Sequence, residues 1–454
     1  MNRARQLAGF VFLQGFLRPF LQLNCFTYMT SIPQLYEAFL QCNGVTTDTR
    51  NILPGQLFVA LKGPNFNGNA FAEKALAAGA KYALIDEPEF AVNAQTLLVP
   101  NALEALQQLG LHHRRQLNIP VLAITGSNGK TTTKELVHAV LATQYKTYTT
   151  KGNLNNHIGV PLTLLSILPD AEMAVIEMGA NHQKEIAAYC SYTEPTHGLI
   201  TNCGKAHLEG FGGVEGVRKG KGELFDWLRS SNGVAFICDD FDYFHGMSQG
   251  LHEIHWYGTN NGEVVGKVLA SEPFLQVSVE RGMNTSIINS QLVGAYNVYN
   301  VLVAATVGKY FGISDANIVH AIEGYTPTNS RSQLMQKNGN HIILDAYNAN
   351  PTSMAAAIDN FAKLQAPNKI LFLGGMMELG EESTQEHAQL IALIQQHQWK
   401  DVILVGGDFA NLPHPFRYFN NSEEAASWWN AQQSAGNYLL VKGSRSMQME
   451  KIVA

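Results

Sequence analysis

Short apolar runs alternate with amphipathic stretches along most of this chain. Between residues 120 and 325 each run is followed by a segment whose apolar positions have helical spacing. This alternation is typical of a mostly parallel sheet with helices on both faces. The strands predicted in this region span residues 121–124, 173–176, 198–201 and 233–238.

The regions on either side show the same alternation on a smaller scale. Before residue 100 the predicted strands are 57–61, 82–85 and 96–99, with an alanine-rich helix at 70–80. After residue 328 four strands are predicted, each followed by a helical stretch, the third of which begins at the capping candidate Ser422. These four strands span residues 341–344, 369–373, 402–405 and 438–441.

These patterns predict an α/β protein of three domains. We expect a small N-terminal α/β domain at residues 29–108, a helix-like connector at 102–116 leading into a central P-loop ATPase-like domain at 109–325, and a Rossmann-like domain at 326–454. The length of 454 residues agrees, because it exceeds the size at which a single core stops growing.

Composition and charge narrow the function classes. The hydrophobic fraction of 46% and charged fraction of 15% are those of an ordinary globular protein. A net charge of -6 without a basic block argues against nucleic-acid binding. Scattered cysteines without CxxC spacing exclude a disulfide framework and a zinc site, and favour the cytoplasm. They are Cys25, Cys42, Cys190, Cys203 and Cys238.

The first 28 residues differ from the rest. Arg3 and Arg5 precede an apolar run at residues 7–16, as in a signal peptide, but the run is interrupted and no small-residue cleavage site follows. It is too short to span a bilayer, so we expect no membrane insertion. A second methionine, Met29, stands just before the helix-capping candidate Ser31. We expect residues 1–28 to be an upstream extension from start-site choice, dispensable for function.

The most informative segment, residues 125–133, reads T-G-S-N-G-K-T-T-T, ends an apolar run and opens a helical stretch. Glycines let backbone N–H groups turn toward an anion, and a helix N-terminus adds its dipole. Lys130 brings a cation to the terminal phosphates and Thr131 an Mg²⁺ ligand, although the spacing is shorter than in the common P-loop. The segment predicts an ATP site made of Thr125, Gly126, Ser127, Asn128, Gly129, Lys130, Thr131 and Thr132.

Polar residues follow two further strands at the same predicted edge. Glu177 ends the strand at 173–176, where a carboxylate reaches the Mg²⁺ of MgATP. His207 lies on a glycine-bounded loop after the next strand, and Lys219 and Lys221 follow in a helical segment. From the residues alone, a solvated glutamate, a surface histidine and solvated lysines stay open as alternatives.

Together these motifs resemble the Mur ligases, from Ser31 to the C-terminus. The carrying segments are the phosphate loop, residues 151–163 (K-G-N-L-N-N-H-I-G-V-P-L-T) and residues 206–212 (A-H-L-E-G-F-G). The resemblance implies an ATP-dependent amide-bond ligase of peptidoglycan synthesis. It assigns catalysis to Lys130, Glu177, His207 and Lys221, and the binding of two Mg²⁺ ions to Thr131, Glu177, His207 and a carbamylated Lys221.

The resemblance also assigns binding residues. Residues 292–300 are similar to the family's L-x-G-x-H-N-x-x-N pattern, with Tyr296 replacing the usual histidine. The implied ATP contacts there and beyond are Asn297, Arg331 and Asp345. Residues 47–50 (T-D-T-R) resemble a uridine-nucleotide motif of the family. Residues 345–351 (D-A-Y-N-A-N-P) resemble the signature of family members that add D-alanyl-D-alanine. Residues 442–445 (K-G-S-R) resemble a motif near the C-terminus of the same members. The implied substrate contacts are Thr47, Asp48, Thr49, Arg50, Asn155, Asn156, Tyr347, Asn348, Asn350, Lys442, Ser444 and Arg445.

The implied reaction joins D-alanyl-D-alanine to UDP-N-acetylmuramoyl-tripeptide through an acyl phosphate. We expect a monomer whose domains close on a hinge near residues 325–329. Three alternatives stay open: a Mur ligase that adds a single amino acid, a folylpolyglutamate-synthase-like ligase, and an ATP-binding module without catalysis. The third peptide residue, diaminopimelate or lysine, is not fixed by the sequence.

Overall fold

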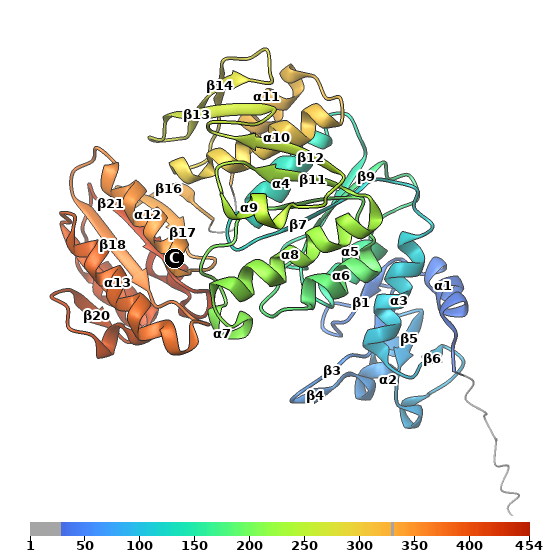
Figure 1. Cartoon of the computed structure of the whole chain (residues 1–454). Coiled ribbons are helices and arrows are strands. Elements are labelled where there is room, and N and C mark those ends of the chain that lie inside the picture. Colours follow the sequence, from blue (N-terminus) through green and yellow to red (C-terminus); the bar gives the residue numbers. More distant parts are fainter. Residues whose placement is uncertain (1–28, 328–330) are drawn as a thin grey trace, which may run out of the picture.

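The computed structural model describes residues 29–327 and 331–454 of the chain. The predicted extension at residues 1–28 lies outside the described residues, and so do residues 328–330, which include part of the hinge predicted at 325–329. Figure 1 shows three units in chain order: the N-terminal part in blue, the central part from cyan through green to yellow and the C-terminal part in orange to red. Each is built on its own main sheet, so the three-domain α/β architecture is confirmed.

The N-terminal domain has a four-stranded parallel sheet in the order β1-β2-β5-β6. Ser31 caps the first helix reciprocally with Gln34, as its sequence suggested. The predicted helix at 70–80 is shorter, because its first residues form a 3-10 turn (Gly68–Phe71). The elements are α1 (Ile32–Leu40), β1 (Val45–Thr46), β2 (Leu57–Val59), β3 (Lys62–Gly63), β4 (Phe66–Asn67), α2 (Ala72–Ala77), β5 (Tyr82–Ile85), β6 (Thr96–Leu98) and α3 (Ala102–Arg114).

The central sheet has nine strands in the order β15-β14-β13-β12-β11-β10-β7-β9-β8. It is parallel from β8 to β13, and β14 and β15 add an antiparallel end. The four predicted strands are β7, β9, β10 and β11, and five others were missed. The strands are β7 (Val121–Thr125), β8 (Thr147–Thr149), β9 (Met173–Glu177), β10 (His197–Ile200), β11 (Val234–Cys238), β12 (Glu253–Gly258), β13 (Val264–Ala270), β14 (Gln276–Arg281) and β15 (Ile287–Asn289).

Helices cover both faces of this sheet, as predicted (Figure 1). One group, α4, α10 and α11, packs together, and α5, α6 and α8 form the other. The domain boundary predicted at residue 108 falls inside the helix α3 and stays a prediction. The helices are α4 (Lys130–Leu141), α5 (Gly159–Leu165), α6 (Glu185–Thr193), α7 (Leu208–Phe211), α8 (Val214–Ser231), α9 (Tyr243–Met247), η3 (Ala295–Asn297), α10 (Val298–Tyr310) and α11 (Asp315–Gly324).

The C-terminal sheet has six strands in the order β16-β17-β21-β18-β19-β20, and only its β16–β17 pair is antiparallel among those described. Its elements are β16 (Gln333–Lys337), β17 (Asn340–Asp345), α12 (Pro351–Lys363), β18 (Lys369–Gly374), α13 (Ser383–Gln395), β19 (Asp401–Val405), β20 (Arg417–Phe419), α14 (Ser422–Ala431) and β21 (Tyr438–Lys442).

Three details of the prediction for this domain are wrong. The strand β20 separates β19 from its helix, because a three-residue strand leaves little periodic signal. The helix α14 does begin at Ser422, but Asn421 caps it by accepting from the Glu424 N–H. After β21 the chain forms two 3-10 turns (Arg445–Met447 and Met449–Val453) in place of a helix.

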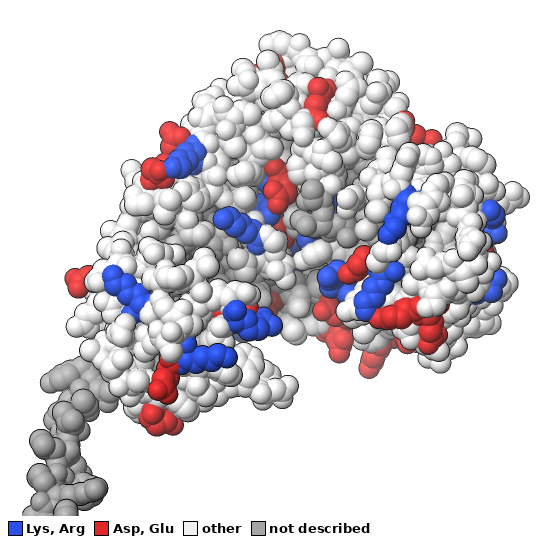
Figure 2. Space-filling model, turned by 180° about the vertical axis from the view of Figure 1, so that it is seen from behind, with Lys and Arg blue, Asp and Glu red and all other residues white. Residues whose placement is uncertain are grey.

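The hydropathy of the helices and the charge on the surface bear on function. Within residues 29–327 and 331–454, no helix is both long and apolar enough to cross a membrane. On the face shown in Figure 2, Lys and Arg side chains lie among Asp and Glu side chains and do not merge into one basic surface.

Candidate active site

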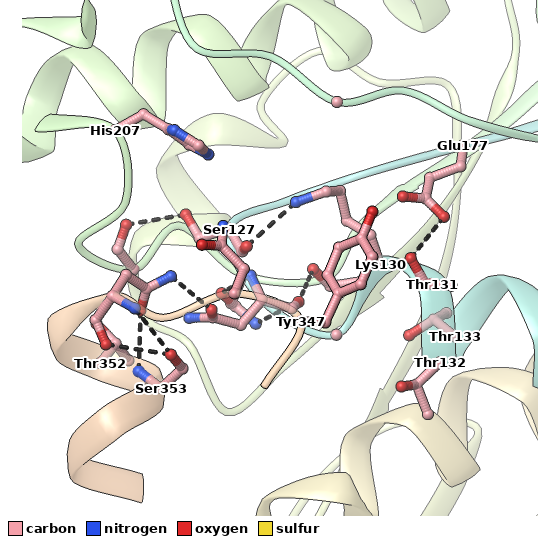
Figure 3. Close-up of a pocket in the computed structure, with 18 of the residues that line it drawn as sticks. Ser127, Lys130, Thr131, Thr132, Thr133, Glu177, His207, Tyr347, Thr352 and Ser353 are labelled. Atoms are coloured by element: carbon pink, nitrogen blue, oxygen red, sulfur yellow. Dashed lines mark hydrogen bonds between the residues drawn. The ribbon is translucent and has the colours of Figure 1, made fainter. Parts of the chain in front are cut away.

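A cavity of about 1020 Å³ lies between the central and C-terminal domains. Its central-domain wall is formed by the phosphate loop and by the ends of β9 and β10, and its other wall by the segments that follow β17 and β21. Because carboxyl ends of parallel strands meet at one edge of a sheet, separated motifs of both domains open into the same space. Figure 3 shows the labelled residues around it.

The phosphate loop runs from the buried strand β7 into α4, as predicted. Gly126 has a φ of 143° and lies so close to Thr201 that an added Cβ would stand 2.0 Å from the Thr201 Oγ1. Gly129 precedes α4 with a φ of 78°, and a Cβ there would stand 2.9 Å from the Asn300 Oδ1. Glycine is therefore required at both positions for steric and conformational reasons.

Lys130 begins α4 and folds back over the loop. Its Nζ donates to the carbonyl oxygens of Gly126 (2.6 Å) and Ser127 (3.1 Å). Burial lowers the pKa of Lys130 to about 8, and the nearby Arg331 adds to this while Glu177 opposes it. An anion between these groups would stabilise the charged ammonium, so the loop suits a phosphate ligand.

Glu177 and Thr131 form a pair at the start of α4 (Figure 3). The Thr131 hydroxyl donates to one carboxylate oxygen of Glu177 at 2.9 Å, and the Asn155 side chain donates to the other at 2.8 Å. Glu177 is only 1% exposed, yet within the described chain no cation pairs with it. A buried carboxylate held by neutral donors beside a hydroxyl is an oxygen donor set that fits Mg²⁺.

His207 lines the same cavity but faces the C-terminal domain. Its Nδ1 pairs with the carboxylate of Glu378, which follows β18, and this pairing lowers the pKa of Glu378. The sequence prediction missed Glu378, which lies a few residues after the end of the apolar strand β18, whereas Glu177 is itself the last residue of β9. The strand before Glu378 can be recognised in the sequence. The contact of Glu378 with His207 cannot, because it depends on how two domains dock.

Lys221 lies inside the central domain on α8. It is 1% exposed, donates to the Ala180 carbonyl at 2.9 Å and lies over the Phe211 ring. Burial, with Lys130 as the next cause, holds the pKa of Lys221 well below its usual range. It is absent from the residues that line the cavity.

The predicted metal ligands are thus only partly gathered. Thr131 and Glu177 are in contact, His207 is paired elsewhere, and Lys221 lies behind the cavity wall. Among the residues described, no three His, Cys, Asp or Glu side chains cluster in a way that would hold a metal ion.

The predicted nucleotide contacts outside the phosphate loop lie together. Asn297, Arg331 and Asp345 line the cavity beside Tyr296. The Arg331 guanidinium stacks 3.5 Å above the Tyr347 ring. Asp345 accepts from the Ser332 N–H at 3.0 Å. This arrangement offers a cation and a carboxylate on the wall opposite the phosphate loop.

The two C-terminal motifs meet at the ends of β17 and β21. Lys442 donates to Asp345 at 2.6 Å and to the Asn348 carbonyl at 3.3 Å. Ser444 accepts from the Met377 N–H at 3.0 Å. Arg445 pairs with Glu450 at 2.8 Å, in an exposed position at the cavity rim.

Asn350 joins this domain to the phosphate loop. Its Oδ1 accepts from the Ser353 N–H at 2.9 Å and so caps α12, while its Nδ2 donates to the Asn128 side chain at 2.8 Å. Nearby, the Lys205 N–H donates to the Thr352 hydroxyl at 3.1 Å, and the Lys205 ammonium pairs with the buried Glu386. The two domains are therefore docked directly at the loop.

The predicted uridine motif lies away from this cavity. Thr47, Asp48, Thr49 and Arg50 belong to the N-terminal domain and are not among the cavity residues. Arg50 pairs with Asp48 at 2.8 Å, which lowers the pKa of Asp48 to about 2. Asn155 and Asn156 do line the cavity, where Asn156 accepts from the Gly159 N–H at 2.9 Å to hold the start of α5.

Three family models match successive parts of the chain. They are the Mur ligase family catalytic domain at residues 41–116, the Mur ligase middle domain at 124–308 and the Mur ligase glutamate ligase domain at 330–445. A UDP-N-acetylmuramoyl-tripeptide–D-alanyl-D-alanine ligase of Bacillus subtilis is 36% identical over 424 residues, covering 90% of this chain and 92% of the relative.

Solved structures agree with the sequence relatives. A structure of MurF from Acinetobacter baumannii matches with a TM-score of 0.83 at 30% identity, covering 93% of this chain and 97% of that one. A MurF ligase of Thermotoga maritima, solved in complex with ADP, matches with a TM-score of 0.81 at 25% identity, covering 91% and 97%. With its phosphate loop, its strand-end glutamate and its three domains all in place, the chain belongs to the Mur ligase family of ATP-dependent ligases.

Proposed function

We propose that this protein joins D-alanyl-D-alanine to UDP-N-acetylmuramoyl-tripeptide with conversion of ATP to ADP and phosphate, in the cytoplasmic stage of peptidoglycan synthesis. One observation carries the proposal: the phosphate loop and the segment Tyr347–Asn350 face one cavity from two domains. The matching relatives that bear this activity as their name support the choice of substrates. The free thiols of Cys42, Cys190, Cys203 and Cys238 fit a reducing compartment.

Two bond exchanges make up the reaction. An oxygen of the tripeptide carboxylate bonds to the γ-phosphorus while the bond to the bridging oxygen breaks, which releases ADP. The dipeptide amine then bonds to the acyl carbon, loses a proton, and the carbon–oxygen bond to phosphate breaks. Lys130 and the loop N–H groups offset the repulsion between the carboxylate and the triphosphate. Arg331 and Asp345 would hold the rest of the nucleotide.

Thr131 and Glu177 would hold Mg²⁺, and His207 a second ion once Glu378 releases it. Bound Mg²⁺ supplies charge neutralisation on the phosphate oxygens. The neutral donors of Thr131 and Asn155 already orient the two Glu177 oxygens.

Lys221 suits carbamylation. Its lowered pKa favours the neutral amine, whose nitrogen can bond to the carbon of carbon dioxide and lose one proton to give an anionic carbamate. That anion would offer oxygen donors to a metal ion in place of the present bond to the Ala180 carbonyl. Replacing Lys221 with alanine should cut activity severely, and added short-chain carboxylates should restore part of it. Full activity of the variant would refute this role.

The remaining substrate contacts are also proposals. Thr47, Asp48, Thr49 and Arg50 would bind the uridine nucleotide, and Asn155 and Asn156 the muramoyl part. Asn348, Asn350 and the Lys442–Arg445 segment would bind the dipeptide, with Tyr347 beside them. We propose that the protein acts as a monomer.

The decisive experiment measures phosphate release from ATP with UDP-N-acetylmuramoyl-tripeptide, with and without D-alanyl-D-alanine. Release that depends on the dipeptide, with the ligated product found by mass spectrometry, supports the proposal. Using the diaminopimelate and lysine tripeptides separately identifies the third residue. Equal rates with a single amino acid on the dipeptide precursor would instead show a neighbouring Mur ligase activity.

A further inference from the structure

The short turn η3, Ala295–Asn297, is contacted by the C-terminal domain at two points. The Ala295 N–H donates to the Asn360 Oδ1 of α12 at 3.1 Å. The Tyr296 hydroxyl lies 3.0 Å from the Ser332 hydroxyl. Both partners belong to the chain after residue 330, so each bond exists only while the two domains are docked.

On its other side η3 is connected to the phosphate loop. Asn297 accepts from the Asn300 side chain at 2.7 Å, and Asn300 accepts from the Thr133 hydroxyl of α4 at 3.0 Å. Asn297, Asn300 and Thr133 are all less than 9% exposed. The Asn300 oxygen is also the atom that an added Cβ at Gly129 would meet. These buried bonds fix the turn relative to the loop, because breaking any of them leaves a polar group unsatisfied.

The turn therefore lies between the C-terminal domain and the phosphate loop, which the reaction must bring together. Tyr296 and Asn297 line the nucleotide cavity, whereas Asn360 does not. If the C-terminal domain moves away, the Ala295 N–H and the Tyr296 hydroxyl lose their protein partners at the same time. The apparent affinity of a ligand that needs the docked arrangement falls in proportion to the population of that arrangement.

We infer that η3 is a docking contact that couples closure of the C-terminal domain to nucleotide binding, with Tyr296 and Asn360 as positioning residues. Asn360 acts from outside the cavity, through the Ala295 N–H. The inference rests on the proposed function only in requiring that ATP binds in this cavity. It concerns how the site is assembled and does not depend on which amine is ligated.

The test measures the Kd of a non-hydrolysable ATP analogue by calorimetry with the full chain and no peptide substrates. Asn360→Ala should raise the Kd about fivefold, the loss expected for one net hydrogen bond. Asn360→Asp keeps an acceptor oxygen for the Ala295 N–H and should retain the affinity. The same analogue should compact the wild-type chain in solution X-ray scattering and compact Asn360→Ala less.

Tyr296→Phe and Ser332→Ala should each raise the Kd by a similar factor, and the double variant should do no more than either one. Tyr145→Phe is the matched control, since its hydroxyl donates to the Phe311 carbonyl at 2.8 Å within the central domain. It should lower the melting temperature without changing the Kd. An unchanged Kd in Asn360→Ala, or multiplicative effects in the double variant, would overturn the coupling. A wild-type chain that binds no analogue overturns both this inference and the proposed ATP site.

Discussion

Gly129→Ala is the sharpest single test of the phosphate loop. Gly129 has a φ of 78°, and Gly312, just after α10, has a φ of 73°. A left-handed conformation costs an alanine about 1–2 kcal/mol at either position. At Gly312 nothing lies within 4 Å of the added Cβ, whereas at Gly129 the Asn300 Oδ1 lies at 2.9 Å. The two variants therefore share the strain and differ in the collision.

Moving Asn300 would weaken its bonds to Thr133 and Asn297, at about 1 kcal/mol each. We expect Gly312→Ala to destabilise the central domain by about 1–2 kcal/mol and Gly129→Ala by about 3–4 kcal/mol. Nucleotide affinity should fall at least about tenfold in Gly129→Ala, because the loop N–H groups move, and stay unchanged in Gly312→Ala.

Hydrogen exchange of peptides from β7 and α10, measured in increasing urea, separates the central domain from the other two. Nucleotide affinity is measured with a fluorescent ATP analogue. Removing the obstacle in Gly129→Ala/Asn300→Ala should make the double variant less unstable than the sum of the singles. Equal stability and equal affinity in the Gly129 and Gly312 variants would refute the steric reasoning.

Three further predictions concern charge. Burial lowers the pKa of Lys130 to about 8, so the charged lysine destabilises the folded state below pH 8, and this destabilisation fades toward pH 10.5. Lys130→Met should therefore abolish turnover yet stabilise the nucleotide-free protein by about 2 kcal/mol at pH 7. Unfolding measurements at rising pH should show this gain in stability shrinking toward pH 10.5. Glu177→Gln keeps the shape of the side chain and one acceptor oxygen but loses the anion, so half-maximal activity should need at least about tenfold more Mg²⁺ in a metal titration. Lys205→Ala leaves the buried Glu386 without its cation, so scattering should show a more open chain, whereas the exposed Lys219→Ala should not change it.

Local signals in the sequence explain what could be predicted. The phosphate loop was found because strand, glycines and helix follow one another within a few residues. Glu177 was found because a buried strand ends at it. The strands β13 to β15 were missed because their pattern is mixed: β13 is buried at Val264–Gly266 and exposed at Lys267–Leu269.

Contacts between domains could not be predicted from the sequence. Nothing local pairs His207 with Glu378, Asn128 with Asn350 or Tyr296 with Ser332, because each pair joins segments that meet only after two sheets dock. The mutual pairing of Asp48 and Arg50 was missed for the opposite reason: the motif resemblance directed both side chains to a substrate.

The bond between Asn350 and Asn128 bears on how ATP is protected from water. The central domain supplies the loop that would hold the phosphates, and the C-terminal domain supplies Asn350, which bonds to that loop. A nucleotide bound to the central domain alone has its terminal phosphate open to solvent, but it also lacks the groups that would arrange a nucleophile in line with it. Closure of the C-terminal domain would both shield the terminal phosphate from water and align the nucleophile. We therefore expect little ATP hydrolysis without ligation.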